Sequence, residues 1–313
     1  MRSSKVISRH RIGGLFAAVL SLFPISAAHA QIFVTNYGAY DTTNGSVGEY
    51  TTSGATINTS LVSGLDGPTG IVISGSDLFV VNHNNNTIGE YTTSGATVNA
   101  SLVSGLNNPW DITVSGSNLF VSNTGTEPAN NGSVGEYTLS GATVNTSLIS
   151  GLQLPYPIAV SGSDLFVGLG NDTIAEYTTS GATVNTDLIS GLNVELSMAV
   201  SGSNLFVANY GSGTIGEYTT SGATVNASLI SGLTDPAGIA VSGSDLYVTN
   251  YQNDTVGEYT TSGALVNADL ISGLDDPSGI AISAVPEPST WVMALGGLGL
   301  LAFWRGHSRR ARG

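Results

Sequence analysis

A Glu-Tyr pair recurs six times along this chain of 313 residues and divides most of it into similar units. The tyrosines stand at positions 50, 91, 137, 177, 218 and 259, so successive units are separated by 41, 46, 40, 41 and 41 residues. A Ser-Gly-Ala triplet follows each pair. A regular period of this length limits the chain to a repeat architecture, in which each unit is one small supersecondary structure.

The segments within a unit are short, β-branched and separated by Gly, Asn, Asp and Ser, which are strand and turn signals. In the unit that begins at residue 238, strands are expected at 238–241, 245–249, 255–260 and 265–271. The first two are nearly continuous apolar runs, as in strands that are covered on both faces. The fourth alternates, as expected of an outer edge strand. Each unit is therefore predicted to be a four-stranded sheet, graded from a buried hub to an exposed rim.

The two ends of the repeat region complement each other. The segment 32–36 aligns with the second strand of a unit, so the first unit lacks a first strand, and the last unit supplies only a first strand, at 279–282. The strand at the C-terminal end would complete the N-terminal sheet. Together with the period of 40–46 residues, this predicts an all-β six-bladed β-propeller over residues 31–285, with four-stranded blades and a ring closed by both ends.

Two segments of the unit resemble NHL-type and streptogramin-lyase-like propeller repeats. These are Leu-x-x-Pro-x-Gly-Ile-Ala-Val at 233–241 and Leu-Phe-Val-x-Asn at 205–209. The resemblance implies the propeller fold over residues 31–283. Those families usually carry a basic residue where this chain has Thr87, Thr214 or Thr255, so RNA binding, known for some NHL propellers, is not implied. The histidine and glutamate that streptogramin lyases use as acid and base have no matching motif here.

The charges are separated along the chain. All eight Lys and Arg residues lie before residue 31 or after residue 304, whereas 21 of the 22 acids lie between residues 31 and 285. Nucleic-acid binding requires a cationic surface that contacts the phosphates, so the repeat region is not a nucleic-acid-binding domain. The chain also has no cysteine, which excludes a disulfide scaffold, a Cys-ligated metal and a thiol nucleophile.

Residues 1–30 read as a secretory signal peptide. A basic start ends at Arg11, an apolar stretch covers 12–25, and Ala28 and Ala30 supply the small residues of a cleavage site. The alternative, an N-terminal membrane anchor, is disfavoured because the apolar stretch is short. The protein is therefore expected to be exported.

Residues 286–313 combine a Pro-Glu-Pro motif, a short apolar segment at 291–304 and an arginine cluster. This order resembles the PEP-CTERM sorting signal, whose motif residues here are Val285, Pro286, Glu287 and Pro288. The resemblance implies processing by an exosortase-type enzyme and transient anchoring in the inner membrane through a short C-terminal helix. The expected destination is the cell envelope or an exopolysaccharide matrix.

A feature that every unit shares is expected to be structural. The glutamate of each Glu-Tyr pair is such a feature, and a solvated or hydrogen-bonded structural role is predicted for Glu49, Glu90, Glu136, Glu176, Glu217 and Glu258. Function is better sought where the repeat departs from its own pattern.

Three consecutive units depart from the Pro-x-Gly that precedes the first strand. They read Pro109-Trp110-Asp111, Pro155-Tyr156-Pro157 and Glu195-Leu196-Ser197, and the only long loop after a second strand, at 123–132, belongs to the same sector. The candidate ligand-binding residues are Trp110, Asp111, Glu127, Tyr156 and Glu195. Aromatic platforms with carboxylates suit sugar rings, which offer apolar faces and hydroxyl donors. The alternative is that Trp110 and Tyr156 only fill the hub.

His83 is the sixth candidate, and the only histidine of the repeat region. It occupies the loop position that holds Tyr37, Tyr210 and Tyr251 in other units. One histidine does not make a catalytic constellation. The oxygen-rich pairs at 171–172, 253–254 and 275–276 are expected to bind Ca²⁺ weakly, without a defined metal site or another cofactor.

These observations favour a non-enzymatic exported propeller that binds or scaffolds envelope or matrix polysaccharide. Two alternatives stay open: a lyase or lactonase whose site lies at the channel mouth, and a purely structural spacer.

Overall fold

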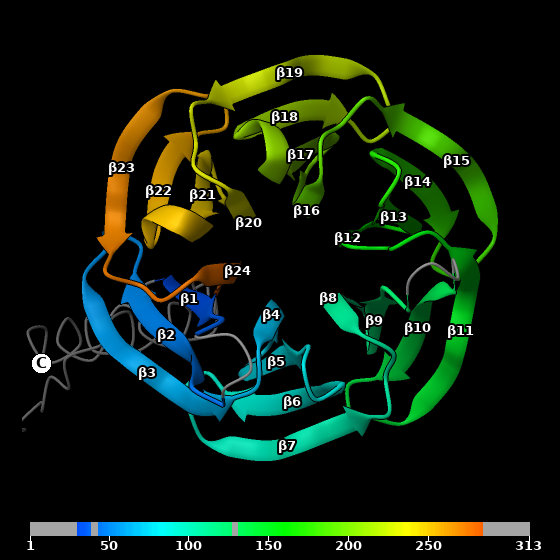
Figure 1. The fold of residues 1–313 in the computed structure, drawn as a ribbon, viewed down its shortest axis with the longest axis horizontal. Helices are drawn as coiled ribbons and strands as arrows, with labels where there is room; N and C mark the ends of the chain where they lie inside the picture. The colour runs from blue at the N-terminus through cyan, green and yellow to red at the C-terminus, as the bar shows by residue number, and fades with distance from the viewer. Residues whose placement is uncertain (1–29, 39–42, 127–130, 284–313) are drawn as a thin grey trace, which may run out of the picture.

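Six antiparallel four-stranded sheets stand around a central channel in the computed structural model (Figure 1). The structure describes residues 30–38, 43–126 and 131–283. The all-β six-bladed propeller that the repeat predicts is confirmed. In each blade the first strand lines the channel and the fourth forms the outer rim.

The strands follow the repeat, blade by blade. Blade 1 contains β24 (Pro277–Ile282), β1 (Gln31–Asn36), β2 (Gly45–Thr51) and β3 (Thr56–Leu65). Blade 2 contains β4 (Pro68–Ser74), β5 (Asp77–Asn82), β6 (Thr87–Thr92) and β7 (Thr97–Ser104). Blade 3 contains β8 (Pro109–Ser115), β9 (Asn118–Asn123), β10 (Gly132–Thr138) and β11 (Thr143–Leu152).

Blade 4 contains β12 (Ile158–Ser161), β13 (Asp164–Leu169), β14 (Thr173–Thr178) and β15 (Thr183–Ser190). Blade 5 contains β16 (Glu195–Ser201), β17 (Asn204–Asn209), β18 (Thr214–Thr219) and β19 (Thr224–Ser231). Blade 6 contains β20 (Pro236–Ser242), β21 (Asp245–Asn250), β22 (Thr255–Thr260) and β23 (Leu265–Ser272). Two 3₁₀ turns, η1 (Tyr210–Ser212) and η2 (Tyr251–Asn253), follow the second strands of blades 5 and 6.

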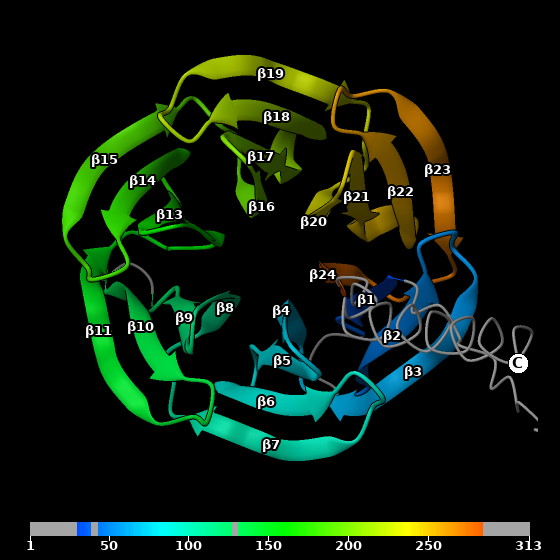
Figure 2. The ribbon, with the colours of Figure 1, turned by 180° about the vertical axis from the view of Figure 1, so that it is seen from behind.

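Blade 1 closes the ring with strands from both ends of the repeat region. β24 pairs antiparallel with β1, with Ile32 opposite Ile282 and Val34 opposite Ile280 (Figure 2). The backbone N–H of Ser283 donates to the carbonyl of Gln31 at 2.9 Å. The predicted closure of the ring is thus confirmed.

The Glu-Tyr pair has a local structural explanation. In five of the six blades the tyrosine folds over a glycine two residues earlier, and a Cβ on Gly89 would lie 2.5 Å from the Tyr91 hydroxyl oxygen. The tyrosine is buried in every blade. The neighbouring glutamate hydrogen-bonds within its own blade, since Asn118 Nδ2 donates to Glu136 at 2.7 Å. The expected structural role of the repeated glutamates agrees with these contacts.

The hydrophobic core lies in the six seams between adjacent blades. In the seam between blades 1 and 2, Phe33 and Val47 pack against Leu78 and Tyr91. The outer strands differ from the expected alternation: residues 224–228 of β19 are all exposed, and Ile230 is buried. Only the last part of an outer strand reaches the next seam, so its first part meets solvent on both faces.

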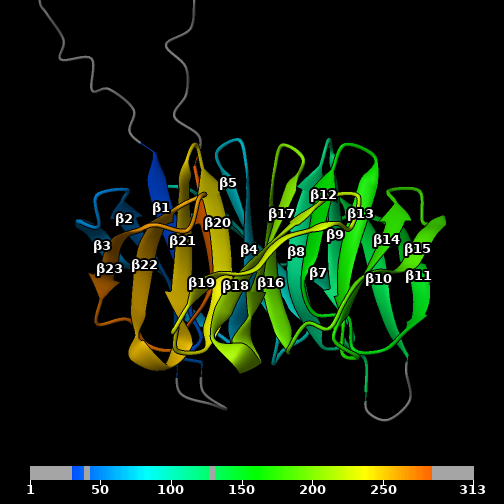
Figure 3. The ribbon, with the colours of Figure 1, turned by 90° about the horizontal axis from the view of Figure 1, so that it is seen from above.

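The loops after second strands and the ends of the propeller segment lie on opposite faces of the ring. The loops that follow the second strands lie on one face, with η1 and η2 at the lower edge of Figure 3, whereas β1 begins at the upper edge. β24 ends beside the start of β1, so it also ends on the upper face. Within the described ranges no helix is long and apolar enough to cross a membrane. The membrane helix predicted within 286–313 and the signal peptide predicted at 1–30 fall almost wholly outside these ranges.

Candidate functional site

A cavity of about 370 Å³ opens where the central channel meets the lower face of the ring. We call it the mouth cavity. Two kinds of segment contribute to it: the loops that follow second strands, and the starts of first strands. Its lining residues are Tyr37, Thr69, His83, Trp110, Leu196, Tyr210, Ala237, Tyr251 and Ser278. Five of the nine are aromatic or imidazole side chains, which gives the cavity flat, partly apolar walls.

Trp110 forms one side of the mouth cavity and lies between two other rings. The centroid of its ring is 5.3 Å from that of His83 and 5.3 Å from that of Tyr156, and both contacts are edge-to-face. Edge-to-face pairs at this distance are the favoured aromatic geometry. The structure therefore brings three of the candidate residues, His83, Trp110 and Tyr156, into one cluster from three consecutive blades.

His83 is oriented by the backbone of the next blade. Its Nδ1 lies 2.9 Å from the carbonyl oxygen of Pro109. A carbonyl can only accept, so Nδ1 carries the proton, and Nε2 is the acceptor nitrogen when the imidazole is neutral. His83 is thus held as one tautomer at the wall of the mouth cavity.

The other side of the mouth cavity is formed by tyrosines. Tyr37 donates its hydroxyl proton to Asn84 Oδ1 at 3.0 Å. Burial, and then the negative charge of Asp276, raise the pKa of Tyr251 to about 12. Burial and the neighbouring Asp235 also raise the pKa of Tyr210. The hydroxyls of Tyr210 and Tyr251 therefore stay protonated at neutral pH, and each donates a hydrogen bond to the aspartate beside it, Asp235 or Asp276.

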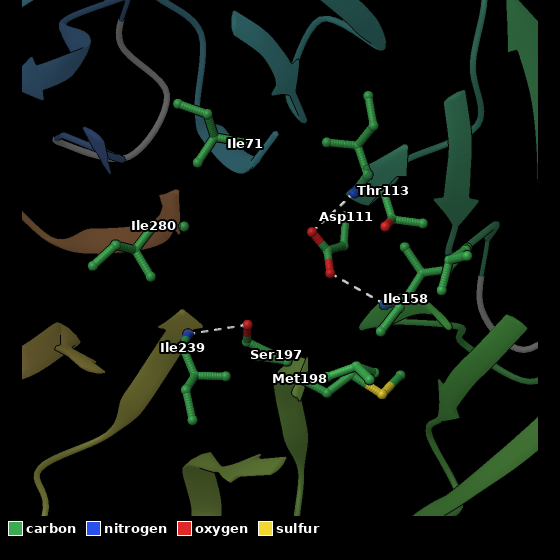
Figure 4. A pocket seen from close by; sticks show the side chains of 14 residues that line it. Ile71, Asp111, Thr113, Ile158, Ser197, Met198, Ile239 and Ile280 are labelled. Carbon is green, nitrogen blue, oxygen red and sulfur yellow. Dashed lines mark hydrogen bonds between the residues drawn. The ribbon is translucent and has the colours of Figure 1, made fainter. Parts of the chain in front are cut away.

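Asp111 turns away from the mouth cavity and into the channel, where a second cavity of about 200 Å³ lies among the first strands. One carboxylate oxygen accepts the N–H of Ile112 at 2.9 Å and the other accepts that of Ile158 in blade 4 at 3.1 Å (Figure 4). Burial raises its pKa to about 7, although these two hydrogen bonds act in the opposite direction. Ser197 has a similar role, because its hydroxyl accepts the N–H of Ile239 at 3.2 Å.

Glu195 corrects the expectation of a ligand-binding carboxylate at the mouth. It is only 1 % exposed and lies against Gly168 in the seam between blades 4 and 5. Neither of its carboxylate oxygens has a hydrogen-bond partner among the described residues. Burial raises its pKa to about 8, and the nearby amides of Glu195 and Leu169 offset this only in part. It occupies the place that Pro236 holds in blade 6, and a residue in that place packs inward.

The loop before Glu195 also departs from the repeat in its backbone. Val194 has a φ of +51°, a conformation that β-branched residues rarely adopt. The equivalent positions of four other blades hold residues that tolerate this conformation, namely Gly67, Asn108, Asp235 and Asp276. Leu154, with a φ of +45°, is the second exception. The strained positions therefore coincide with two of the three blades whose sequence departs from Pro-x-Gly.

Several residues of the site were not among the candidates. Thr69, Leu196, Ala237 and Ser278 line the mouth cavity at the repeat position of Trp110, and Asp235 and Asp276 lie beside its tyrosines. The repeat alignment could have identified them by their equivalence to Trp110. Glu127, the remaining candidate, lies outside the described residues.

The acids of the expected Ca²⁺-binding pairs have local structural roles. Asp172 Oδ1 accepts the N–H of Val194 at 2.9 Å, and Asp254 Oδ1 accepts the N–H of Asp276 at 3.0 Å. No group of three or more metal-ligating side chains occurs within the described part of the chain. Weak Ca²⁺ binding stays a prediction.

Residues 284–310 match the family model of the PEP-CTERM protein-sorting motif. The motif implies export, a membrane-anchored C-terminal sorting signal and processing by an exosortase-like system. A comparison with curated protein sequences found no significant match.

Solved structures share the propeller. A propeller in a nidogen/laminin complex is 13 % identical, with a TM-score of 0.67, over 82 % of this chain and 99 % of that chain. Virginiamycin B lyase from Staphylococcus aureus is 19 % identical, with a TM-score of 0.52, over 68 % of this chain and 73 % of the lyase chain. A gluconolactonase from Xanthomonas campestris is 14 % identical, with a TM-score of 0.56, over 72 % of this chain and 84 % of the gluconolactonase chain. At these identities the likeness establishes the fold alone, so the chain combines a six-bladed propeller, similar to streptogramin-lyase structures, with a PEP-CTERM sorting motif.

Proposed function

We propose that this exported propeller binds saccharide units of an envelope or matrix polysaccharide in the mouth cavity, without changing them chemically. The observation that carries the proposal is the composition of the cavity wall: a tryptophan on one side and three tyrosines on the other, around about 370 Å³ of space. This volume lies within the usual range for small-ligand sites.

A sugar ring has an apolar face and a rim of hydroxyl groups. Trp110 offers a flat ring, held in place by edge contacts with His83 and Tyr156. The carboxylates of Asp235 and Asp276 and the hydroxyl oxygens of the tyrosines offer acceptors for the hydroxyl groups of the rim. Apolar and polar partners thus meet in one cavity, as saccharide binding requires.

The exit of the chain from the ring leaves the mouth cavity accessible. Asn36 and Pro277 pair at the mouth end of blade 1, next to Tyr37, whereas Ile32 and Ile282 pair at the other end. Residue 283, the last described residue, therefore lies on the face opposite the cavity. We expect a polysaccharide to reach the cavity while the chain is anchored.

Calorimetry and fluorescence on residues 31–283 test this proposal. All strands of the closed ring lie within this segment, and Trp110 is its only tryptophan, so tryptophan fluorescence reports on the cavity alone. We expect saturable binding of exopolysaccharide from the host bacterium, with a change in Trp110 fluorescence. Trp110→Ala should weaken binding at least about tenfold, whereas Val184→Ala, on the exposed rim, should not change it. Absence of binding would overturn the proposal.

A lyase or lactonase is the second candidate, and the fixed tautomer of His83 favours it. An acceptor Nε2 at the cavity wall is what a general base requires. The test is turnover of lactones and of a streptogramin B by the same segment. His83→Asn keeps an amide donor for the Pro109 carbonyl and removes the base. Turnover that His83→Asn abolishes would establish an enzyme, whereas saturable polysaccharide binding without turnover of either substrate supports a binding protein.

A further inference from the structure

We propose that the mouth cavity selects amine-bearing, cationic saccharides over neutral and anionic ones, with the ammonium group seated between Tyr210 and Tyr251 beside Asp276. This inference rests on the proposed saccharide binding and specifies its ligand class. It follows from how aromatic rings and carboxylates are distributed around the cavity.

The tyrosine side of the cavity is built by three consecutive blades, 5, 6 and 1. The backbone N–H of Tyr37 donates to the carbonyl of Asp276 at 3.0 Å, and that of Tyr251 donates to the carbonyl of Asp235 at 3.0 Å. Each aspartate lies two residues before a residue that lines the cavity, Ala237 or Ser278. The loops therefore fix both carboxylates at the rim of the tyrosine side.

One carboxylate acts on two tyrosines at once. The negative charge of Asp276 reaches the hydroxyls of both Tyr210 and Tyr251, and the hydroxyls of Tyr37 and Tyr210 lie close enough to influence Tyr251. Aromatic faces with a nearby carboxylate are a recurrent arrangement for binding organic ammonium groups, because the ring faces and the carboxylate attract the same positive charge.

The negative charge of this side has no cationic partner in the propeller. No Lys or Arg occurs between residues 31 and 304. Burial raises the pKa of Asp276, and the negative charges of Asp254 and Asp275 raise it further. A cationic ligand would relieve this repulsion, whereas uronic acids or phosphorylated sugars would increase it.

The opposite side of the cavity suits the remainder of such a ligand. His83 and Trp110 line it with flat rings. An amino sugar can place its ring face on Trp110 and direct its ammonium group toward the tyrosines. The asymmetry of the cavity thus predicts one orientation of the ligand as well as its charge.

The test compares two oligomers that differ only at the nitrogen, the pentamer of glucosamine and the pentamer of N-acetylglucosamine. Calorimetry with residues 31–283 should show about tenfold tighter binding of the glucosamine pentamer, a preference between those of an exposed and a desolvated cation–π contact. Asp276→Asn and the double variant with Asp235→Asn should reduce this preference to about threefold or less. Asn108 occupies the equivalent position of blade 3 with the same left-handed φ, so asparagine fits the backbone there.

Asp187→Asn is the matched control. It removes the same charge from the exposed strand β15, on the outer rim, and should leave the preference unchanged. An equal loss in this control would overturn the assigned position, because it would indicate an effect of net charge. Equal or tighter binding of the acetylated pentamer, or binding of host exopolysaccharide but of neither pentamer, would overturn the inference and leave the proposed function standing. Failure of all three ligands to bind would overturn both.

Discussion

The backbone N–H of Gly279 donates a hydrogen bond to the hydroxyl oxygen of Thr35 at 2.7 Å, although 244 residues separate them. The same hydroxyl donates to the carbonyl of Thr69 in blade 2, also at 2.7 Å. One side chain therefore links the two strands that close the ring and ties blade 1 to its neighbour. Ser122 and Thr249 make the same pair of contacts between blades 3 and 4 and between blades 6 and 1.

Replacing Thr35 by valine should weaken the closure without changing side-chain shape. The equivalent position of blade 2 is Val81, so valine fits there. The N–H of Gly279 and the carbonyl of Thr69 would lose this partner in a buried seam, which destabilises a fold by about 1–3 kcal/mol. Urea unfolding measures the change. Thr35→Ser, which keeps the hydroxyl, should lose much less, and equal losses in the two variants would contradict this account.

Glu195 should make the fold less stable as the pH rises. Its pKa is about 8 in the folded chain and near 4.5 when unfolded, so the folded state binds more protons between these values. The free energy of unfolding should therefore fall as the pH rises from about 5 to about 8, by at most about 1.4 kcal/mol per pH unit for this group. Asp111 acts in the same direction between its ordinary value of 3.8 and about 7.

Two substitutions isolate the contribution of Glu195. Glu195→Gln removes the ionisable group. Glu195→Pro introduces the proline that blade 6 has at the equivalent position, Pro236. Both should flatten the pH dependence and stabilise the ring most at pH 8, because an ionised carboxylate no longer has to be buried. Thermal unfolding at pH 5 and pH 8 is the measurement. A wild-type slope that persists in both variants would assign the effect to another group.

The repeat made most of the fold predictable. The positive-φ glycines and the apolar inner strands recur in each unit, and the Tyr-over-Gly contact recurs in five of the six, so the blade number, strand order and closure could be inferred from their spacing. The alternation expected for the outer strands was wrong because burial there depends on how far a strand reaches into a seam, which periodicity does not encode.

The candidate site was predictable only in part. Trp110, Tyr156 and His83 lie together because equivalent positions of consecutive blades are neighbours in a ring. Asp111 follows Trp110 in a strand, where successive side chains point in different directions, and it therefore lines the channel. The burial of Glu195 depends on the space beside Gly168 in another blade, which no local pattern reveals.

Tyr156 should act on ligand binding only through Trp110. It does not line the mouth cavity, but its ring lies edge-to-face with Trp110 at a centroid distance of 5.3 Å. Such a contact is worth about 0.5–1.5 kcal/mol, so Tyr156→Ala should weaken saccharide binding by about two- to tenfold. Tyr156→Phe keeps the ring and should weaken binding less. The position of Trp110 fluorescence emission, measured without ligand, should shift in the alanine variant. An unchanged spectrum together with weaker binding would argue for direct contact instead.

Val194 should be replaceable by asparagine with a gain in stability. Its φ of +51° costs a β-branched residue about 1–2 kcal/mol, whereas asparagine adopts this conformation readily and stands at the equivalent position 108. Val194 is 45 % exposed, so little packing is lost. Urea unfolding should show a gain of about 1 kcal/mol. The same change at Val184, which is 53 % exposed and lies in ordinary strand geometry, should show no gain. Leu196, two residues on, lines the mouth cavity, so saccharide affinity measured in the same variant shows whether the strain serves binding. Unchanged affinity with higher stability would mean that it does not.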